Sequence, residues 1–147
     1  MGNKPFTMTN TNNIIGYDNI KSKTYTLIST LNESDCCIKG TLTPNEEVEF
    51  INNCISTNSQ KNIVIYGKNY LDKSIFEQYK KLNSLGFDNV YLYPGGIFEW
   101  LLLQETFGED MFETNYIEKD ILKYNKCHSS LSIVYRMLPR NNSVSLI

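Results

Sequence analysis

The stretch Lys61–Ser74, KNIVIYGKNYLDKS, has the layout of a strand that runs into an anion-binding loop. An apolar run ends at Gly67, a polar turn follows, and a helical pattern begins near Ser74. At such a turn the first N–H groups of the helix are unpaired, and the helix dipole favours negative charge. Lys68 and Lys73 add positive charge, so the stretch fits either an ordinary βα loop with solvated lysines or a loop that holds a small anion. The predicted anion-binding loop comprises Gly67, Lys68, Asn69, Tyr70, Leu71, Asp72, Lys73 and Ser74.

Two of these loop residues have a further predicted role. Asp72 and Ser74 are of the types that cap helices, and they stand where the next helix begins. The loop contains no cysteine and no arginine, so its own side chains offer neither a thiolate nor a bidentate guanidinium.

The thiols of the chain are the other candidate nucleophiles. Cys36 and Cys37 follow a predicted strand and could approach the same sheet edge as the loop. Cys54 lies on an apolar helix face and is expected in the core. Cys127 and His128 are neighbours in sequence, and an exposed, inert pair is expected because adjacent side chains rarely aim at each other. No cysteine pair has metal-ligand spacing and there is one histidine, so neither a metal site nor a cofactor is predicted.

Composition limits the classes of function that fit. A chain of 147 residues corresponds to one domain. The net charge of −2 is spread along the chain without a basic run, which argues against nucleic acid as a partner. No apolar run is long enough for a bilayer, and the start does not read as a signal peptide. A cytoplasmic protein with reduced thiols is therefore expected.

Strand and helix patterns alternate along the chain, which predicts βαβ units and a mostly parallel sheet. Residues 14–22 are expected as a short strand and turn, residues 36–38 as a brief pairing segment, and residues 115–125 as a helix. Residues 130–138, SLSIVYRML, fit either a strand or a docking tail. The main strands are predicted over residues 24–30, 62–66 and 89–93, and the main helices over residues 43–56, 74–85 and 97–108.

The helix expected over residues 43–56 has a clear start and an apolar side. Thr43 can cap it, and Pro44 suits the first helical position. The residues predicted to face the core are Val48, Ile51, Cys54 and Ile55.

The order of motifs from residue 62 to residue 108 resembles the C-terminal half of a rhodanese (sulfurtransferase) domain. A strand leads into the loop, a helix reaches LGF, a strand follows, and PGGIFEW opens the next helix. A fainter resemblance extends over residues 14–112. It implies an α/β fold of the rhodanese-like three-layer type, with a five-stranded, mainly parallel sheet and helices on both faces. The resulting division is a flexible arm over residues 1–13, a domain over residues 14–125, and a C-terminal extension or docking tail over residues 126–147.

In rhodaneses a cysteine at the base of this loop carries sulfur as a persulfide. Aligned on the strand, that position is Gly67; aligned on the distance back from LGF, it is Asn69 or Tyr70. The resemblance thus predicts a domain without sulfurtransferase activity that binds a small anion or a protein partner in a regulatory role. The alternative is an active thiosulfate sulfurtransferase, or a related thiol enzyme, that uses Cys36 or Cys37.

Overall fold

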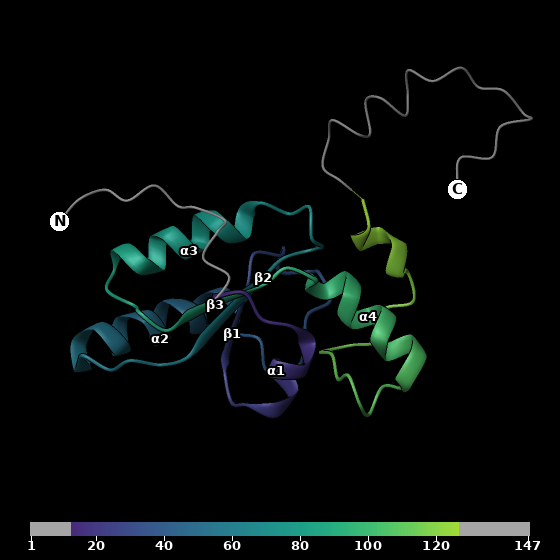
Figure 1. Cartoon of the computed structure of the whole chain (residues 1–147), viewed down its shortest axis with the longest axis horizontal. Coiled ribbons are helices and arrows are strands. Elements are labelled where there is room, and N and C mark those ends of the chain that lie inside the picture. Colours follow the sequence, from purple (N-terminus) through teal and green to yellow (C-terminus); the bar gives the residue numbers. More distant parts are fainter. Residues whose placement is uncertain (1–12, 127–147) are drawn as a thin grey trace, which may run out of the picture.

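Three short parallel strands form the sheet at the centre of the computed structural model, which describes residues 13–126 (Figure 1). The strands β1 (Thr26–Ser29), β2 (Ile63–Tyr66) and β3 (Val90–Tyr93) lie in the order β1-β2-β3. Both neighbouring pairs are parallel. The carboxyl ends of all three strands therefore meet at one edge of the sheet, where ligands of open α/β sheets bind.

Helices alternate with these strands, so the α/β class and the parallel sheet predicted from the sequence are confirmed. The central strand β2 is fully buried, as its continuous apolar sequence predicts. Within the described ranges no helix has the length and apolar character of a membrane span. The helices are α1 (Tyr17–Ser22), α2 (Pro44–Thr57), α3 (Ser74–Ser84), α4 (Gly96–Phe107) and a 3₁₀ turn, η2 (Ile121–Tyr124).

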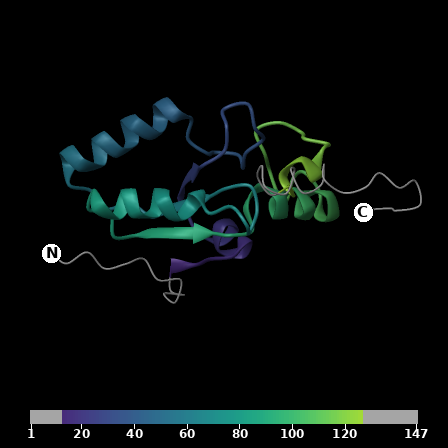
Figure 2. The same cartoon turned by 90° about the horizontal axis from the view of Figure 1, so that it is seen from above.

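Helical residues cover both faces of the sheet. On one face Val64 of β2 packs in a cluster with Trp100 and Leu101 of α4. On the other face Ile65 of β2 packs with residues of α2 and α3, among them Leu82. Figure 2 shows α2 and α3 on the same side of β3, with α1 on the opposite side.

The described residues hold three strands rather than the five that the resemblance implies. Ile14 pairs with Leu92, and Ile38 pairs with Thr114, but each pairing is an isolated bridge. At residue 38 the backbone N–H donates to the hydroxyl of Tyr66 instead of a neighbouring strand. A side chain thus takes the place of a ladder partner at that position.

Two local expectations need correction. Residues 17–22 form helix α1 rather than a turn, and residues 115–125 contain only the short turn η2 rather than a full helix. In that second segment the N–H of Asn115 donates to the carbonyl of Cys37 at 3.0 Å. The start of the segment is therefore held by residues distant in sequence, which competes with helical pairing.

The side of α2 that faces the core differs from the predicted one. Its start is as expected, with the hydroxyl of Thr43 accepting from Glu46 N–H. Cys54 is buried, but Val48 and Ile55 are 59% and 50% exposed. The buried side is centred on Cys54 with Phe50 and Ile51 packed beside it. The apolar residues Val48 and Ile55 thus remain on the surface.

Candidate functional site

The loop between β2 and α3 lies at the carboxyl edge of the sheet, near the start of α4 (Figure 1). The carbonyl of Gly67 accepts from the N–H of Ile97 at 3.0 Å, and the carbonyl of Lys68 accepts from Phe98 at 2.9 Å. This approach requires glycine at residue 96, where φ is +66° and an added Cβ would lie 2.6 Å from the Gly67 carbonyl oxygen. The start of α4 therefore fixes the backbone of the loop.

A negative group already occupies the loop, and it is the carboxylate of Asp72. Its Oδ2 accepts from the N–H of Lys68 at 2.9 Å, and its Oδ1 accepts from the N–H of Ser74 at 3.0 Å. The hydroxyl of Ser74 lies 2.6 Å from the same Oδ1. These are the contacts that a bound anion would make with a strand-to-helix loop. The chain supplies the anion from within the loop itself.

The hydrogen bonds to Asp72 favour its ionised form. Burial by itself would raise the pKa of this carboxyl, but the donors on Ser74 and Lys68 outweigh burial and lower its pKa. The N-cap position of α3 is Lys73, which makes no side-chain capping bond, so the prediction that Asp72 caps the helix is off by one residue: Asp72 stands just before the cap and accepts from the first N–H of α3. Ser74 is the first residue of α3, one position after the N-cap, and its hydroxyl donates a hydrogen bond to the carboxylate of Asp72.

The carboxylate of Asp72 also occupies the space that a side chain at position 67 would need. A Cβ at residue 67 would lie 2.9 Å from Cγ of Asp72 and 2.9 Å from Oγ1 of Thr30. Real Cβ atoms are not found so close to other heavy atoms, so a larger residue at position 67 would require the side chains of both Asp72 and Thr30 to move. The hydroxyl of Thr30 is in turn 2.7 Å from that of Ser74. Thr30, which follows β1, thus joins the loop through the shared carboxyl edge.

The middle of the loop divides into a buried anchor and an exposed tip. Asn69 is buried; its Oδ1 accepts from Leu71 N–H at 2.9 Å, and its Nδ2 donates to the carbonyl of Tyr124 at 2.7 Å. Tyr70 is 72% exposed and Leu71 is 43% exposed. Lys73 is exposed beside them. Asn69 therefore has a structural role, while the tip is available for contacts.

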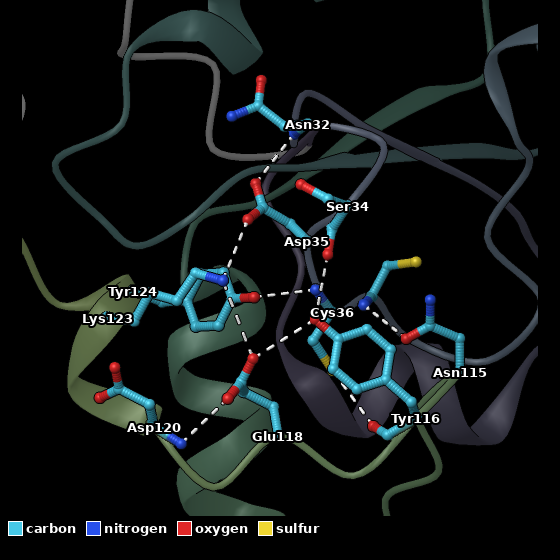
Figure 3. Close-up of polar contacts among 11 residues, drawn as sticks. Asn32, Ser34, Asp35, Cys36, Asn115, Tyr116, Glu118, Asp120, Lys123 and Tyr124 are labelled. Carbon is cyan, nitrogen blue, oxygen red and sulfur yellow. Dashed lines mark hydrogen bonds and ion pairs between the residues drawn. The ribbon is translucent and has the colours of Figure 1, made fainter.

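The two candidate thiols lie in a turn after β1, which we call the cysteine turn (residues 32–37; Figure 3). Cys36 is fully buried, its N–H donates to the hydroxyl of Tyr124 at 2.8 Å, and its Sγ lies 3.4 Å from the carbonyl oxygen of Tyr116. Burial raises the pKa of the Cys36 thiol to about 11. Cys37 is half-buried, and burial together with the charge of Asp35 raises its pKa as well. Both shifts lower the thiolate fraction at neutral pH.

Charged groups hold the cysteine turn against the segment that ends in η2. Asp35 is buried; its Oδ2 accepts from Asn32 N–H at 3.0 Å, and its Oδ1 is 3.7 Å from Nζ of Lys123. Lys123 also lies 3.9 Å from Oε2 of Glu118, and Tyr116 donates to the carbonyl of Ser34 (Figure 3). The cysteine turn and the segment that ends in η2 are therefore joined by side-chain contacts.

Tyr124 connects these two segments to the loop. Its carbonyl accepts from the side chain of Asn69, and its hydroxyl accepts from the backbone of Cys36. The structure thus brings the cysteine turn and the loop to the same part of the molecule through one shared residue. No sequence pattern indicated Tyr124, since both contacts are long-range. Thr30 could have been found, because it follows a parallel strand whose end meets the loop.

The remaining candidates have simpler positions. Cys54 is 5% exposed and belongs to the core, as predicted. Cys127 and His128 lie outside the described residues. Among residues 13–126 no group of three or more histidine, cysteine, aspartate or glutamate side chains could hold a metal ion.

We expect the substitution Asp72→Asn to destabilise the protein in a pH-dependent way. The folded-state pKa of Asp72 is lowered, so its contribution to stability is present above the unfolded value of about 4 and is lost as pH falls through the folded value. The free energy of unfolding should fall by about 1 kcal/mol at pH 7, because the carboxylate is only partly buried and its contacts are partly screened. Urea denaturation from pH 7 down to about 2 should show the difference between the two proteins shrinking in acid.

Asp88→Asn is the matched control, since Asp88 is exposed and lies outside the loop. An equal loss of stability in both variants, or a loss for Asp72→Asn that does not change with pH, would contradict the role given to the carboxylate.

The carboxyl edge thus carries a loop with an internal anion and a turn with two thiols of raised pKa. A comparison of the chain with protein-family models, with curated proteins and with solved structures finds no match.

Proposed function

We propose that the protein is a rhodanese-like domain without sulfurtransferase activity, which acts in the cytoplasm as a binding or regulatory module. In this proposal the complete fold is the five-stranded, three-layer form of that family. One observation carries the proposal: the carboxylate of Asp72 occupies the loop and the space beside Gly67 where a nucleophilic side chain would have to stand.

The arrangement of elements supports the proposal. The chain runs from β2 through the loop to α3, then through β3 to α4, whose first N–H groups hold the loop. The tight approach at Gly96 explains why the helix of the resembling motif begins with a glycine. This order of elements, around a loop without a cysteine, is the observation in the scaffold that supports the proposal.

The chemistry of the described thiols supports the absence of sulfur transfer. A persulfide forms on a thiolate, and a thiol with a pKa of about 11, such as Cys36, is ionised to roughly one part in ten thousand at pH 7. Cys37 is near the negative charge of Asp35, which opposes the thiolate further. Neither thiol has the electropositive surroundings that activate such nucleophiles.

The loop offers two kinds of contact to a ligand. A small anion could use the N–H groups of Lys68 and Ser74 only by displacing the carboxylate of Asp72. A protein partner could instead use the exposed tip, where Tyr70 and Leu71 offer apolar surface and Lys73 a positive charge. Protein binding at the tip leaves Asp72 in place, so it is the mode that the geometry favours.

A thiosulfate:cyanide sulfurtransferase assay tests the proposal. We expect turnover at the level of a blank, and no persulfide adduct by mass spectrometry after incubation with thiosulfate. The matched variants are Cys36→Ser and Cys37→Ser. Robust turnover that disappears in either variant would establish the alternative, a thiol enzyme with a relocated cysteine, and would remove the proposal.

Removal of the internal carboxylate tests the anion-binding geometry of the loop. In Asp72→Ala the N–H groups of Lys68 and Ser74 lose their acceptor, so thiosulfate or sulfate should bind about tenfold more tightly than to the unmodified protein. Isothermal titration calorimetry measures the difference. Asp88→Ala removes the same charge at an exposed position and should change nothing. Equal affinity in all three proteins would show that the loop does not bind anions.

A further inference from the structure

A groove of about 700 Å³ lies between the end of α4 and the segment that leads into η2, away from the loop. It carries more acidic than basic side chains: four carboxylates against one lysine. These acidic residues do not form a group that could hold a metal ion, as judged over residues 13–126. The lining residues are Gln104, Glu105, Gly108, Glu109, Asp110, Ile117, Glu118, Lys119 and Ile121.

The part of the chain that follows residue 126 has the opposite charge. Residues 127–147 contain Arg136 and Arg140, the only arginines of the protein, and no aspartate or glutamate. Arginine pairs with carboxylates through a planar fork of donors, which makes it well suited to an acidic groove. The charges of groove and segment are therefore complementary.

The apolar residues of the two parts also match. The groove includes Ile121, and Ile117 is 49% exposed there. Close by in sequence, Phe107 and Met111 are 60% and 52% exposed. Exposed large apolar residues beside polar ones are typical of interaction surfaces. The segment supplies apolar residues before and between its two arginines, namely Leu131, Ile133, Val134, Met137 and Leu138.

The chain geometry allows contact within one molecule. The turn η2, which lines the groove through Ile121, ends two residues before Lys126, the last described residue. Arg136 stands ten positions after Lys126, and ten extended steps of the chain span up to about 33 Å. A segment tied so close to the groove has a high effective concentration there, which favours it over a separate molecule.

We propose that residues 131–140 of the same chain dock into this groove, with Arg136 and Arg140 paired to its carboxylates. The apolar residues of the segment, such as Ile133 and Leu138, then cover Ile117 and Ile121. In this proposal the groove is an intramolecular docking surface. The docking does not involve the loop between β2 and α3, and it does not depend on whether the protein transfers sulfur.

A photo-cross-linking experiment on the full chain tests this proposal. The cross-linking amino acid p-benzoylphenylalanine replaces Ile117 in one variant and Val48 in the control variant. Both positions are about half exposed, so both variants should fold, and Val48 lies on α2. After irradiation and proteolysis, mass spectrometry should find links from residue 117 to residues 131–140 in protein of monomer mass. Residue 48 should give none to that segment.

Reversing charges in the groove tests whether ion pairs, and not mere proximity, determine the cross-linking yield from residue 117. Glu105→Lys combined with Glu109→Lys should lower the yield from residue 117 about fivefold, as expected for the loss of two exposed ion pairs. Arg136→Glu combined with Arg140→Glu on that background should restore the yield. Links only between two copies, links to another segment such as Tyr70–Leu71, or a yield unchanged by charge reversal would each overturn the proposal.

Discussion

The loop at the carboxyl edge depends on the contact between the carboxylate of Asp72 and the N–H groups of Lys68 and Ser74. A helix begins at Ser74, and its first N–H groups need acceptors that the helix cannot supply. The carboxylate of Asp72 supplies an acceptor to the N–H of Ser74, and it lies beside Gly67 while it also accepts from the N–H of Lys68. A local requirement of helix formation therefore determines how the loop closes and what fills it.

Two other parts of the molecule hold the loop in the same conformation. The start of α4 donates to the carbonyls of Gly67 and Lys68, which is possible because residue 96 has no side chain. On the other side Asn69 donates to Tyr124, which also accepts from Cys36. A loop fixed from three directions presents its exposed tip, Tyr70 and Leu71, in a defined position. Such preorganisation reduces the entropic cost of binding a partner.

The sequence predicts the central elements well because their signals are local. Continuous apolar runs indicate buried parallel strands, and Thr43 and Pro44 give the start of α2. Helix periodicity predicts Val48 and Ile55 of α2 as core residues, but the sheet contacts the side of the helix that carries Phe50, Ile51 and Cys54. Helix periodicity indicates a stripe, but the neighbouring sheet decides its centre.

The site was predictable only in part. The sequence places Asp72 next to the start of α3, but the position of its carboxylate where a side chain of residue 67 would lie depends on the three-dimensional path of the loop. Tyr124 and Asp35 act through contacts that span many residues, so no short motif indicates them. Beyond the three central strands, residues 13–126 contain only isolated bridges at Ile14 and Ile38, and at residue 38 a hydrogen bond to the Tyr66 side chain takes the place of a ladder partner.

The most direct measurement of the central claim is an NMR titration of the Asp72 side-chain carboxyl together with the amides of Lys68 and Ser74. Hydrogen bonds to the ionised form lower the pKa of the carboxyl, so it should titrate below the ordinary aspartate value of about 3.9. The two amide resonances should shift with the same midpoint, because they lose their acceptor when the carboxylate is protonated. A pKa at or above the ordinary value, with amide shifts that do not follow the carboxyl, would contradict the account.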